Sequence, residues 1–91
     1  MKYGQSRGGN AISWVDGEWH DDEPAVAKAS DHAMWLGSAV FDGARSMAGK
    51  VPDLEAHCAR AIRSARIMGM APDVTTEDIV ELSLEGIQQF P

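Results

Sequence analysis

The segment at residues 40–47, VFDGARSM, carries the first residues whose types and spacing could do chemistry. In an extended chain Phe41, Gly43 and Arg45 share one face, because side chains alternate between the two faces of a strand. An aromatic ring, a gap and a cation in this order suit a wall against which a planar or anionic ligand lies. The residues alone favour a simpler structure, an edge strand with a bulge at Gly43 and a solvated Arg45. Asp42 lies on the opposite face, where a backbone amide or a nearby cation is its expected partner.

Arg60 is the second candidate, because a guanidinium presents a fork of donors that suits a phosphate or a carboxylate. His57 and Ser64 lie three and four residues away on the same helical stripe and could support it there. Arg63 and Arg66 follow closely, however, and three arginines in seven residues are typical of a solvated helix face. Composition alone favours this second interpretation.

The sequence indicates neither a metal ligand set nor a catalytic nucleophile. His32 and His57 have no cysteine or second histidine at ligand spacing, so we expect no metal site. Cys58 adjoins His57, but neighbouring helix positions point about a quarter-turn apart, and Cys58 falls on an apolar stripe. A Cys–His nucleophile pair is therefore disfavoured.

The N-terminal half predicts a hairpin, a short helix and a strand. Asp16-Gly17 favours a two-residue hairpin turn, which would place Trp14 opposite Trp19. A cap at residue 30 or 31 predicts one short helical turn. Residues 38–47 then alternate as a strand does, and the Ala-Gly-Lys that follows predicts a turn.

The C-terminal half predicts two longer helices. The first begins at Pro52-Asp53, with Asp53 as its N-cap, and ends before Gly69. Its apolar stripe comprises Leu54, Cys58, Ala61, Ile62, Ala65 and Met68. Thr75 or Thr76 caps the second helix. The expected buried face of that helix comprises Ile79, Val80, Leu84 and Ile87.

The order of these elements predicts an α+β fold, in which helices pack on a small antiparallel sheet. The 91 residues fit one small domain at residues 11–91, after a loose, glycine-containing lead-in at 1–10. A net charge of −6 argues against nucleic acid as a partner. A single cysteine fits a reducing, cytoplasmic compartment, and we find neither a signal peptide nor a membrane span.

Three segments, HAMWLGSAVFDGARS, LEAHCARAIRSARIMGM and TTEDIVEL, are informative in combination. With the W-x-D-G-x-W hairpin and the H-x-x-R-x-x-x-S-A helix, they resemble the N-terminal part of the fold-type IV pyridoxal-phosphate aminotransferases. That group comprises the branched-chain aminotransferases and their relatives, D-amino-acid aminotransferase and aminodeoxychorismate lyase. The resemblance covers residues 12–88 and implies the small N-terminal domain of the D-amino-acid aminotransferase-like fold, with pyridoxal 5′-phosphate as cofactor.

The resemblance implies a role for each of five residues. Arg60 would hold the cofactor phosphate. Phe41, Gly43 and Arg45 would border the substrate pocket, with Arg45 near a substrate carboxylate. Leu36 stands where branched-chain enzymes commonly have a tyrosine that reaches into the partner subunit's pocket.

The chain also departs from the family's pattern. Trp35 and Asp42 stand in place of a histidine and a glutamate, which bears on the substrate more than on the fold. The family's catalytic lysine lies in a second domain downstream, and Lys2, Lys28 and Lys50 do not match its context. We therefore assign no catalytic residue and expect this chain, without that lysine, to be part of a longer enzyme.

The expected function is part of a pyridoxal-phosphate-dependent aminotransferase that acts as a homodimer. Its expected substrates are branched-chain or other hydrophobic amino acids and 2-oxoglutarate. An aminodeoxychorismate lyase or a D-amino-acid aminotransferase is the alternative within the family. A non-catalytic dimerising domain is the alternative from another class, if the chain is complete.

Overall fold

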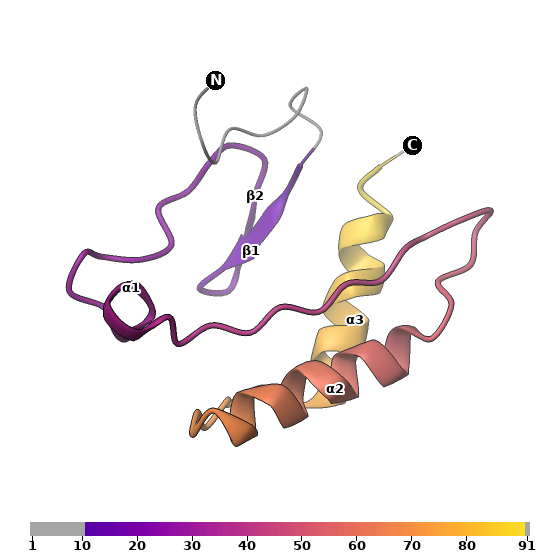
Figure 1. Cartoon of the computed structure of the whole chain (residues 1–91). Coiled ribbons are helices and arrows are strands. Elements are labelled where there is room, and N and C mark those ends of the chain that lie inside the picture. The colour runs from indigo at the N-terminus through magenta and orange to yellow at the C-terminus, as the bar shows by residue number, and fades with distance from the viewer. Residues whose placement is uncertain (1–10, 91) are drawn as a thin grey trace.

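The computed structural model describes residues 11–90, so the predicted lead-in at residues 1–10 lies outside the described part of the chain. A two-stranded antiparallel sheet comes first, followed by three helices (Figure 1). The elements are β1 (Ser13–Val15), β2 (Glu18–His20), α1 (His32–Leu36), α2 (Leu54–Ile67) and α3 (Thr76–Ile87). The predicted α+β class is confirmed.

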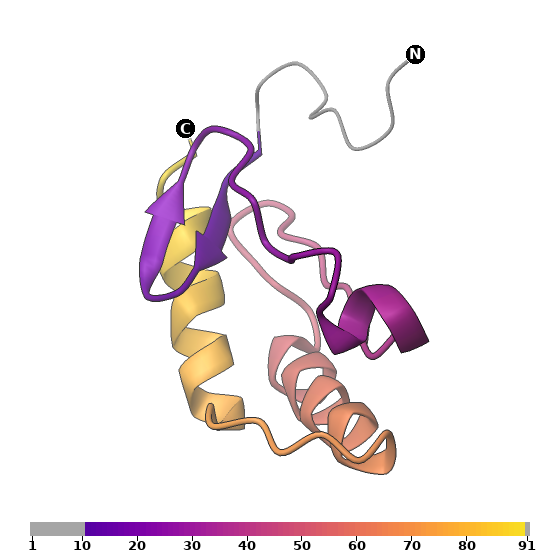
Figure 2. The same cartoon turned by 90° about the vertical axis from the view of Figure 1, so that its left-hand side faces the viewer.

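The hairpin forms as predicted, with Trp14 paired opposite Trp19. Asp16 and Gly17 both have positive φ, 51° and 89°, as a primed turn requires. The hairpin lies beside α3 (Figure 2), where the Trp19 ring covers Gly86. A Cβ on Gly86 would come within 2.6 Å of the indole ring, so this close approach requires a residue without a side chain.

Helix α1 is a short turn whose ends are set by local backbone preferences. Asp31 stands at its N-cap, as predicted, but its carboxylate accepts the Lys28 backbone N–H at 2.8 Å rather than a helix N–H. Gly37 ends the helix with a φ of 66°, a left-handed conformation that glycine adopts without strain.

Helix α2 contributes the core, and its predicted stripe is largely confirmed. Cys58, Ile62 and Ala65 are buried, whereas Met68 at the C-terminal end is half-exposed. The helix ends at Ile67, before Gly69 as predicted, and the N–H groups of Gly69 and Met70 donate to carbonyls of the last turn.

Asp53 is the N-cap residue of α2, as predicted, but its side chain does not cap the helix. Asp53 precedes the helix, but its carboxylate makes no hydrogen bond to the first turn. Its φ is 57°, in the left-handed region, whereas a capping side chain reaches the first turn from an extended backbone.

Helix α3 begins with a capping box. The Thr75 hydroxyl accepts the Asp78 N–H at 3.1 Å, and the Asp78 carboxylate accepts the Thr75 N–H at 2.8 Å. Of the two predicted candidates, Thr75 is therefore the cap. The predicted burial of Leu84 was wrong, because it is 43% exposed and Gly86 instead faces the hairpin.

The predicted strand at residues 38–47 was also wrong. Within the described residues, β1 and β2 pair only with one another, and no strand pairs with residues 38–47. Without a partner its alternating pattern gives an extended chain and no hydrogen-bonded ladder. Met47 and Lys50 alone form a bridge, across the predicted turn, in which Ala48 and Gly49 have positive φ.

Over residues 38–43 the extended segment nevertheless keeps the alternation that the sequence predicted. Val40 and Asp42 are half-buried, whereas Phe41 and Arg45 are exposed. The segment crosses the pair formed by α2 and α3, as Figure 1 shows, so its half-buried side faces the helices.

Candidate functional site

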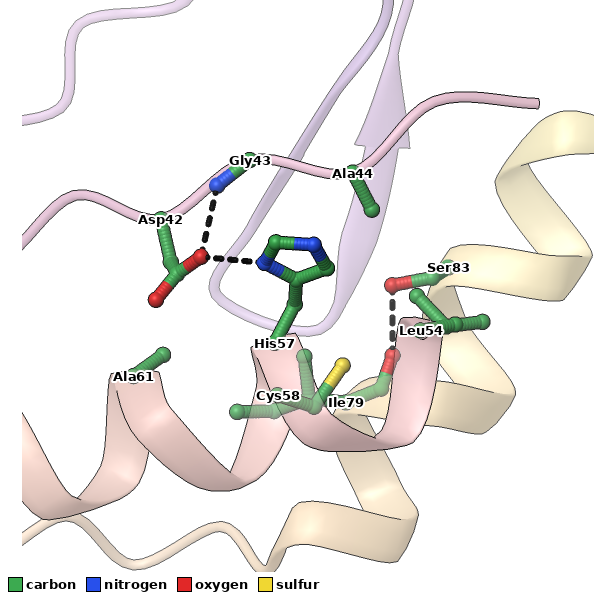
Figure 3. A pocket seen from close by; sticks show the side chains of 9 residues that line it. All are labelled: Asp42, Gly43, Ala44, Leu54, His57, Cys58, Ala61, Ile79 and Ser83. Carbon is green, nitrogen blue, oxygen red and sulfur yellow. Dashed lines mark hydrogen bonds and ion pairs between the residues drawn. The ribbon is translucent and has the colours of Figure 1, made fainter. Parts of the chain in front are cut away.

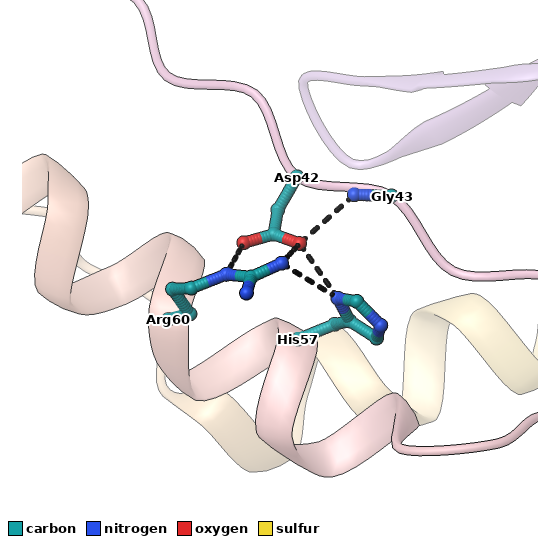
Figure 4. A network of polar contacts seen from close by, with 4 residues as sticks. All are labelled: Asp42, Gly43, His57 and Arg60. Carbon is teal, nitrogen blue, oxygen red and sulfur yellow. Dashed lines mark hydrogen bonds and ion pairs between the residues drawn. The ribbon is translucent and has the colours of Figure 1, made fainter.

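The site is centred on the Asp42 carboxylate, whose side chain is only 8% exposed (Figure 4). Arg60 on α2 binds it through two parallel hydrogen bonds, from Nε to Oδ2 at 2.6 Å and from Nη2 to Oδ1 at 2.8 Å. The Gly43 backbone N–H donates to Oδ1 at 2.9 Å. Asp42 thus has both kinds of partner that the sequence suggested, a backbone amide and a cation.

His57 completes this cluster from one turn earlier on α2. Its Nδ1 lies 2.7 Å from Asp42 Oδ1 and 3.1 Å from Arg60 Nη2. A carboxylate oxygen can only accept, so Nδ1 carries the hydrogen and donates to Asp42. Arg60 Nη2 and His57 Nδ1 are then two neighbouring donors that converge on one oxygen.

These contacts decide the charge of the cluster. The hydrogen bonds from Arg60 and then from His57 hold the pKa of Asp42 far below its usual value, although burial acts in the opposite direction. The carboxylate in turn raises the pKa of Arg60. Asp42 is therefore ionised at neutral pH and is unsuited to act as a general acid or base there.

Arg60 keeps one edge of its guanidinium open. Asp42 occupies the edge formed by Nε and Nη2, whereas Nη1 makes no hydrogen bond or ion pair within residues 11–90. The Arg60 side chain is 56% exposed. The edge formed by Nη1 and Nη2 is therefore able to bind an oxyanion, and this arrangement fits a phosphate group.

A pocket of about 120 Å³, which we call the helix-side pocket, lies beneath the extended segment (Figure 3). It is lined by residues 42–44, by Leu54, His57, Cys58 and Ala61 of α2, and by Ile79 and Ser83 of α3. Burial raises the pKa of the Cys58 thiol, and the Ser83 hydroxyl donates to a backbone carbonyl at 2.7 Å. Neither group is an activated nucleophile.

A second hollow, the turn-side pocket, adjoins the helix-side pocket. It has a volume of about 400 Å³ and shares Gly43, Ala44 and His57 with the first pocket. Arg45 lines it as well. A Cβ on Gly43 would meet only the tip of the Phe41 ring, at 3.6 Å, so the fold itself does not require glycine at this position.

The predicted site residues therefore fall into two groups. Gly43 and Arg45 line the turn-side pocket, and Arg60 lies beside Asp42 at the edge of the helix-side pocket. Phe41 and Leu36 are 91% and 68% exposed. The structure of this chain does not bring these two side chains to either pocket.

Sequence reasoning placed His57 and Arg60 on one stripe but missed that both contact Asp42. The alternating pattern of residues 38–47 could have indicated these contacts, because it predicts that Asp42 faces the element against which the segment packs. The sequence did not show that this would be α2.

Other kinds of site are not found in the described residues. No group of histidine, cysteine or acidic side chains within residues 11–90 is arranged to hold a metal ion. In the same part of the chain, no helix has the length and apolar character needed to cross a membrane.

Comparisons with known proteins relate this chain to aminotransferases. No protein-family model matches the chain. Residues of this chain align with a probable branched-chain-amino-acid aminotransferase of Rickettsia bellii, 32% identical over 68 residues, or 75% of this chain and 24% of that protein. A D-alanine aminotransferase of Staphylococcus epidermidis is 28% identical over 69 residues, or 76% of this chain and 24% of that protein.

A solved structure is also similar to this chain in fold. The X-ray structure of an aminotransferase from Brucella abortus bound to pyridoxal phosphate superposes with a TM-score of 0.84 and 42% identity, over 88% of this chain and 29% of that chain. The resemblance to the fold-type IV aminotransferases is thereby confirmed. The chain spans about a quarter of the length of the curated relatives it matches.

Proposed function

We propose that this chain forms one wall of the cofactor and substrate site of a pyridoxal-phosphate-dependent aminotransferase. Arg60 carries the proposal, because its open edge presents two donors to an oxyanion while Asp42 holds the other edge. The likeness to an aminotransferase bound to pyridoxal phosphate supports the choice of cofactor. Residues 11–91 would be the small N-terminal domain of the enzyme, with the catalytic lysine in another domain.

The residues of this chain would bind and orient rather than transfer protons. When pyridoxal phosphate is bound, it supplies an electron sink for the Cα atom of the amino-acid substrate. Arg60 would hold its phosphate, Gly43 would leave room for the ligand, and Arg45 would bind a substrate carboxylate. Phe41 and Leu36 would join the site where a second subunit of a homodimer covers them, and their exposure supports this.

We propose that the intact enzyme moves amino groups between branched-chain or other hydrophobic amino acids and 2-oxoglutarate. A relative from Methanocaldococcus jannaschii, a putative branched-chain-amino-acid aminotransferase 28% identical over 82% of this chain and 26% of that protein, supports this choice. The D-alanine aminotransferases of Staphylococcus epidermidis make a D-amino-acid aminotransferase the second candidate. A cytoplasmic location belongs to the same proposal, and the single buried cysteine is compatible with it.

Cofactor retention tests the role of Arg60. In the protein expressed from its complete reading frame, we expect Arg60→Ala to lose most of its absorbance at roughly 330–420 nm, where bound cofactor absorbs, after dialysis. Arg63→Ala is the matched control, because Arg63 is exposed on the same helix and makes no ion pair within residues 11–90. Unchanged absorbance in Arg60→Ala would count against the phosphate role.

Turnover tests the substrate wall. We expect Gly43→Val to lower kcat/KM by about tenfold or more, since it would narrow the approach of a ligand to the backbone. Its unfolding temperature should stay unchanged, because the space beside Gly43 accepts a side chain. A fully active Gly43→Val variant would rule out close approach of a ligand to the backbone at this position. Assays of the unmodified enzyme with L-leucine and D-alanine as amino donors separate the two candidate functions.

A further inference from the structure

We propose that Asp42 is a positioning residue, which fixes the Arg60 guanidinium so that its open edge meets the cofactor phosphate. This inference rests on the proposed function. Arg60 is a long side chain on an exposed helix face, and it would otherwise sample many conformations. Two parallel hydrogen bonds to one carboxylate restrict both its direction and the plane of its guanidinium.

The carboxylate can fix Arg60 because it is itself fixed. Its Oδ1 accepts from the Gly43 backbone N–H and from His57 Nδ1, and its side chain is almost fully buried. Oδ2 is left to Arg60 Nε. The backbone amide ties Asp42 to the extended segment, and His57 ties it to α2, so Asp42 cannot follow a motion of Arg60 alone.

The cluster also joins the two parts of the proposed site. Gly43 and Arg45, which line the turn-side pocket, belong to the segment that carries Asp42. Arg60 belongs to α2. Asp42 bridges the two elements, so the position of the phosphate contact is coupled to the position of the substrate wall.

If the charge of Asp42 is removed, electrostatic repulsion and the orientation of Arg60 predict opposite changes in phosphate affinity. A carboxylate beside a phosphate repels it, so on charge alone the removal of the Asp42 charge would tighten phosphate binding. If orientation of Arg60 dominates, the same change weakens binding, because the guanidinium loses its bidentate partner. The sign of the effect therefore distinguishes a positioning residue from an incidental neighbour.

The test uses 4-deoxypyridoxine 5′-phosphate and 4-deoxypyridoxine, which lack the aldehyde and cannot react with lysines. Binding of both is measured by calorimetry to the protein expressed from its complete reading frame, after removal of bound cofactor. We expect Asp42→Asn to weaken the binding of the phosphorylated probe about tenfold. The affinity for the unphosphorylated probe should stay unchanged. Asp42→Glu should restore part of this loss, since it keeps a carboxylate for Arg60.

The double variant separates this inference from the proposed function. If Asp42 acts through Arg60, then Arg60→Ala combined with Asp42→Asn should bind no more weakly than Arg60→Ala alone. Tighter or unchanged binding of the phosphorylated probe to Asp42→Asn would overturn the positioning role, and so would an equal loss for both probes. If Arg60→Ala itself leaves phosphate binding unchanged, the proposed function fails as well.

Discussion

The pair formed by α2 and α3 and the segment at residues 32–47 are stabilised in different ways. The helix pair encloses a small apolar core of Cys58, Ile62 and Ala65. The segment at 32–47 instead leaves large apolar side chains uncovered, among them Trp35 and Phe41, which are 74% and 91% exposed. Its firmest attachment to the helices is polar and runs through Asp42.

The difference shows that an apolar pattern gives structure only where a partner surface is present. The stripe of α2 meets α3 in this chain, so Cys58, Ile62 and Ala65 become buried. The alternating residues of 38–47 meet no third strand in the described residues, so the segment stays extended and unpaired. A local pattern predicts the shape of a segment, whereas its burial depends on what lies opposite.

Truncation of the core should have the largest effect on the helix pair. We expect Ile62→Ala to lower the free energy of unfolding by about 3 kcal/mol, because Ile62 is nearly inaccessible and its removal leaves a cavity. Urea denaturation followed by circular dichroism measures this. Ile67→Ala is the matched control on the same helix, since Ile67 is 79% exposed and should change stability by less than about 0.5 kcal/mol. Equal losses would show that the helix pair has no distinct core.

Acid should release the polar attachment before it affects the core. The pKa of Asp42 is lowered in the folded state, so its contribution to stability is full above its ordinary pKa of 3.8 and is lost as the pH falls below that value. We expect urea midpoints measured from about pH 6 to about pH 2 to fall less steeply for Asp42→Asn than for the wild type.

The control for this pH dependence is Asp73→Asn, because Asp73 is exposed and has no ion pair within residues 11–90. Its profile should follow that of the wild type. A wild-type slope in Asp42→Asn would mean that the Asp42–Arg60 pair does not stabilise the fold.

Removal of the α3 cap should have a smaller effect. We expect Thr75→Ala to destabilise the protein by about 1 kcal/mol, because the Asp78 N–H loses the hydroxyl that it donates to. Thermal unfolding checks this against Thr76→Ala, whose side chain makes no capping bond. Indistinguishable variants would show that the box does not set the start of α3.

The smallest change is expected in the exposed segment. In the 91-residue chain on its own, Phe41→Ser should alter the free energy of unfolding by less than about 0.5 kcal/mol, because Phe41 is almost wholly solvent-exposed there. A loss comparable to that of Ile62→Ala would show that Phe41 is covered in solution. That outcome would break the contrast between the two regions.

The features that followed from the sequence are those decided by neighbouring residues. The Asp16-Gly17 turn and a threonine cap for α3 depend on residues within a few positions, and both formed as predicted. The Asp42–Arg60 pair joins residues 18 apart, and Leu84 lost its expected burial because the hairpin lies over Gly86. Both features depend on how elements distant in the sequence pack against one another, and a local sequence pattern does not contain that information.

The account depends most directly on where the cofactor phosphate binds. A crystal structure of the protein, expressed from its complete reading frame with pyridoxal phosphate bound, would settle this. We predict phosphate oxygens about 3 Å from Arg60 Nη1 and Nη2, with Asp42 still bound to Nε. A phosphate held away from Arg60, or an Arg60 that has released Asp42 to reach it, would contradict the account.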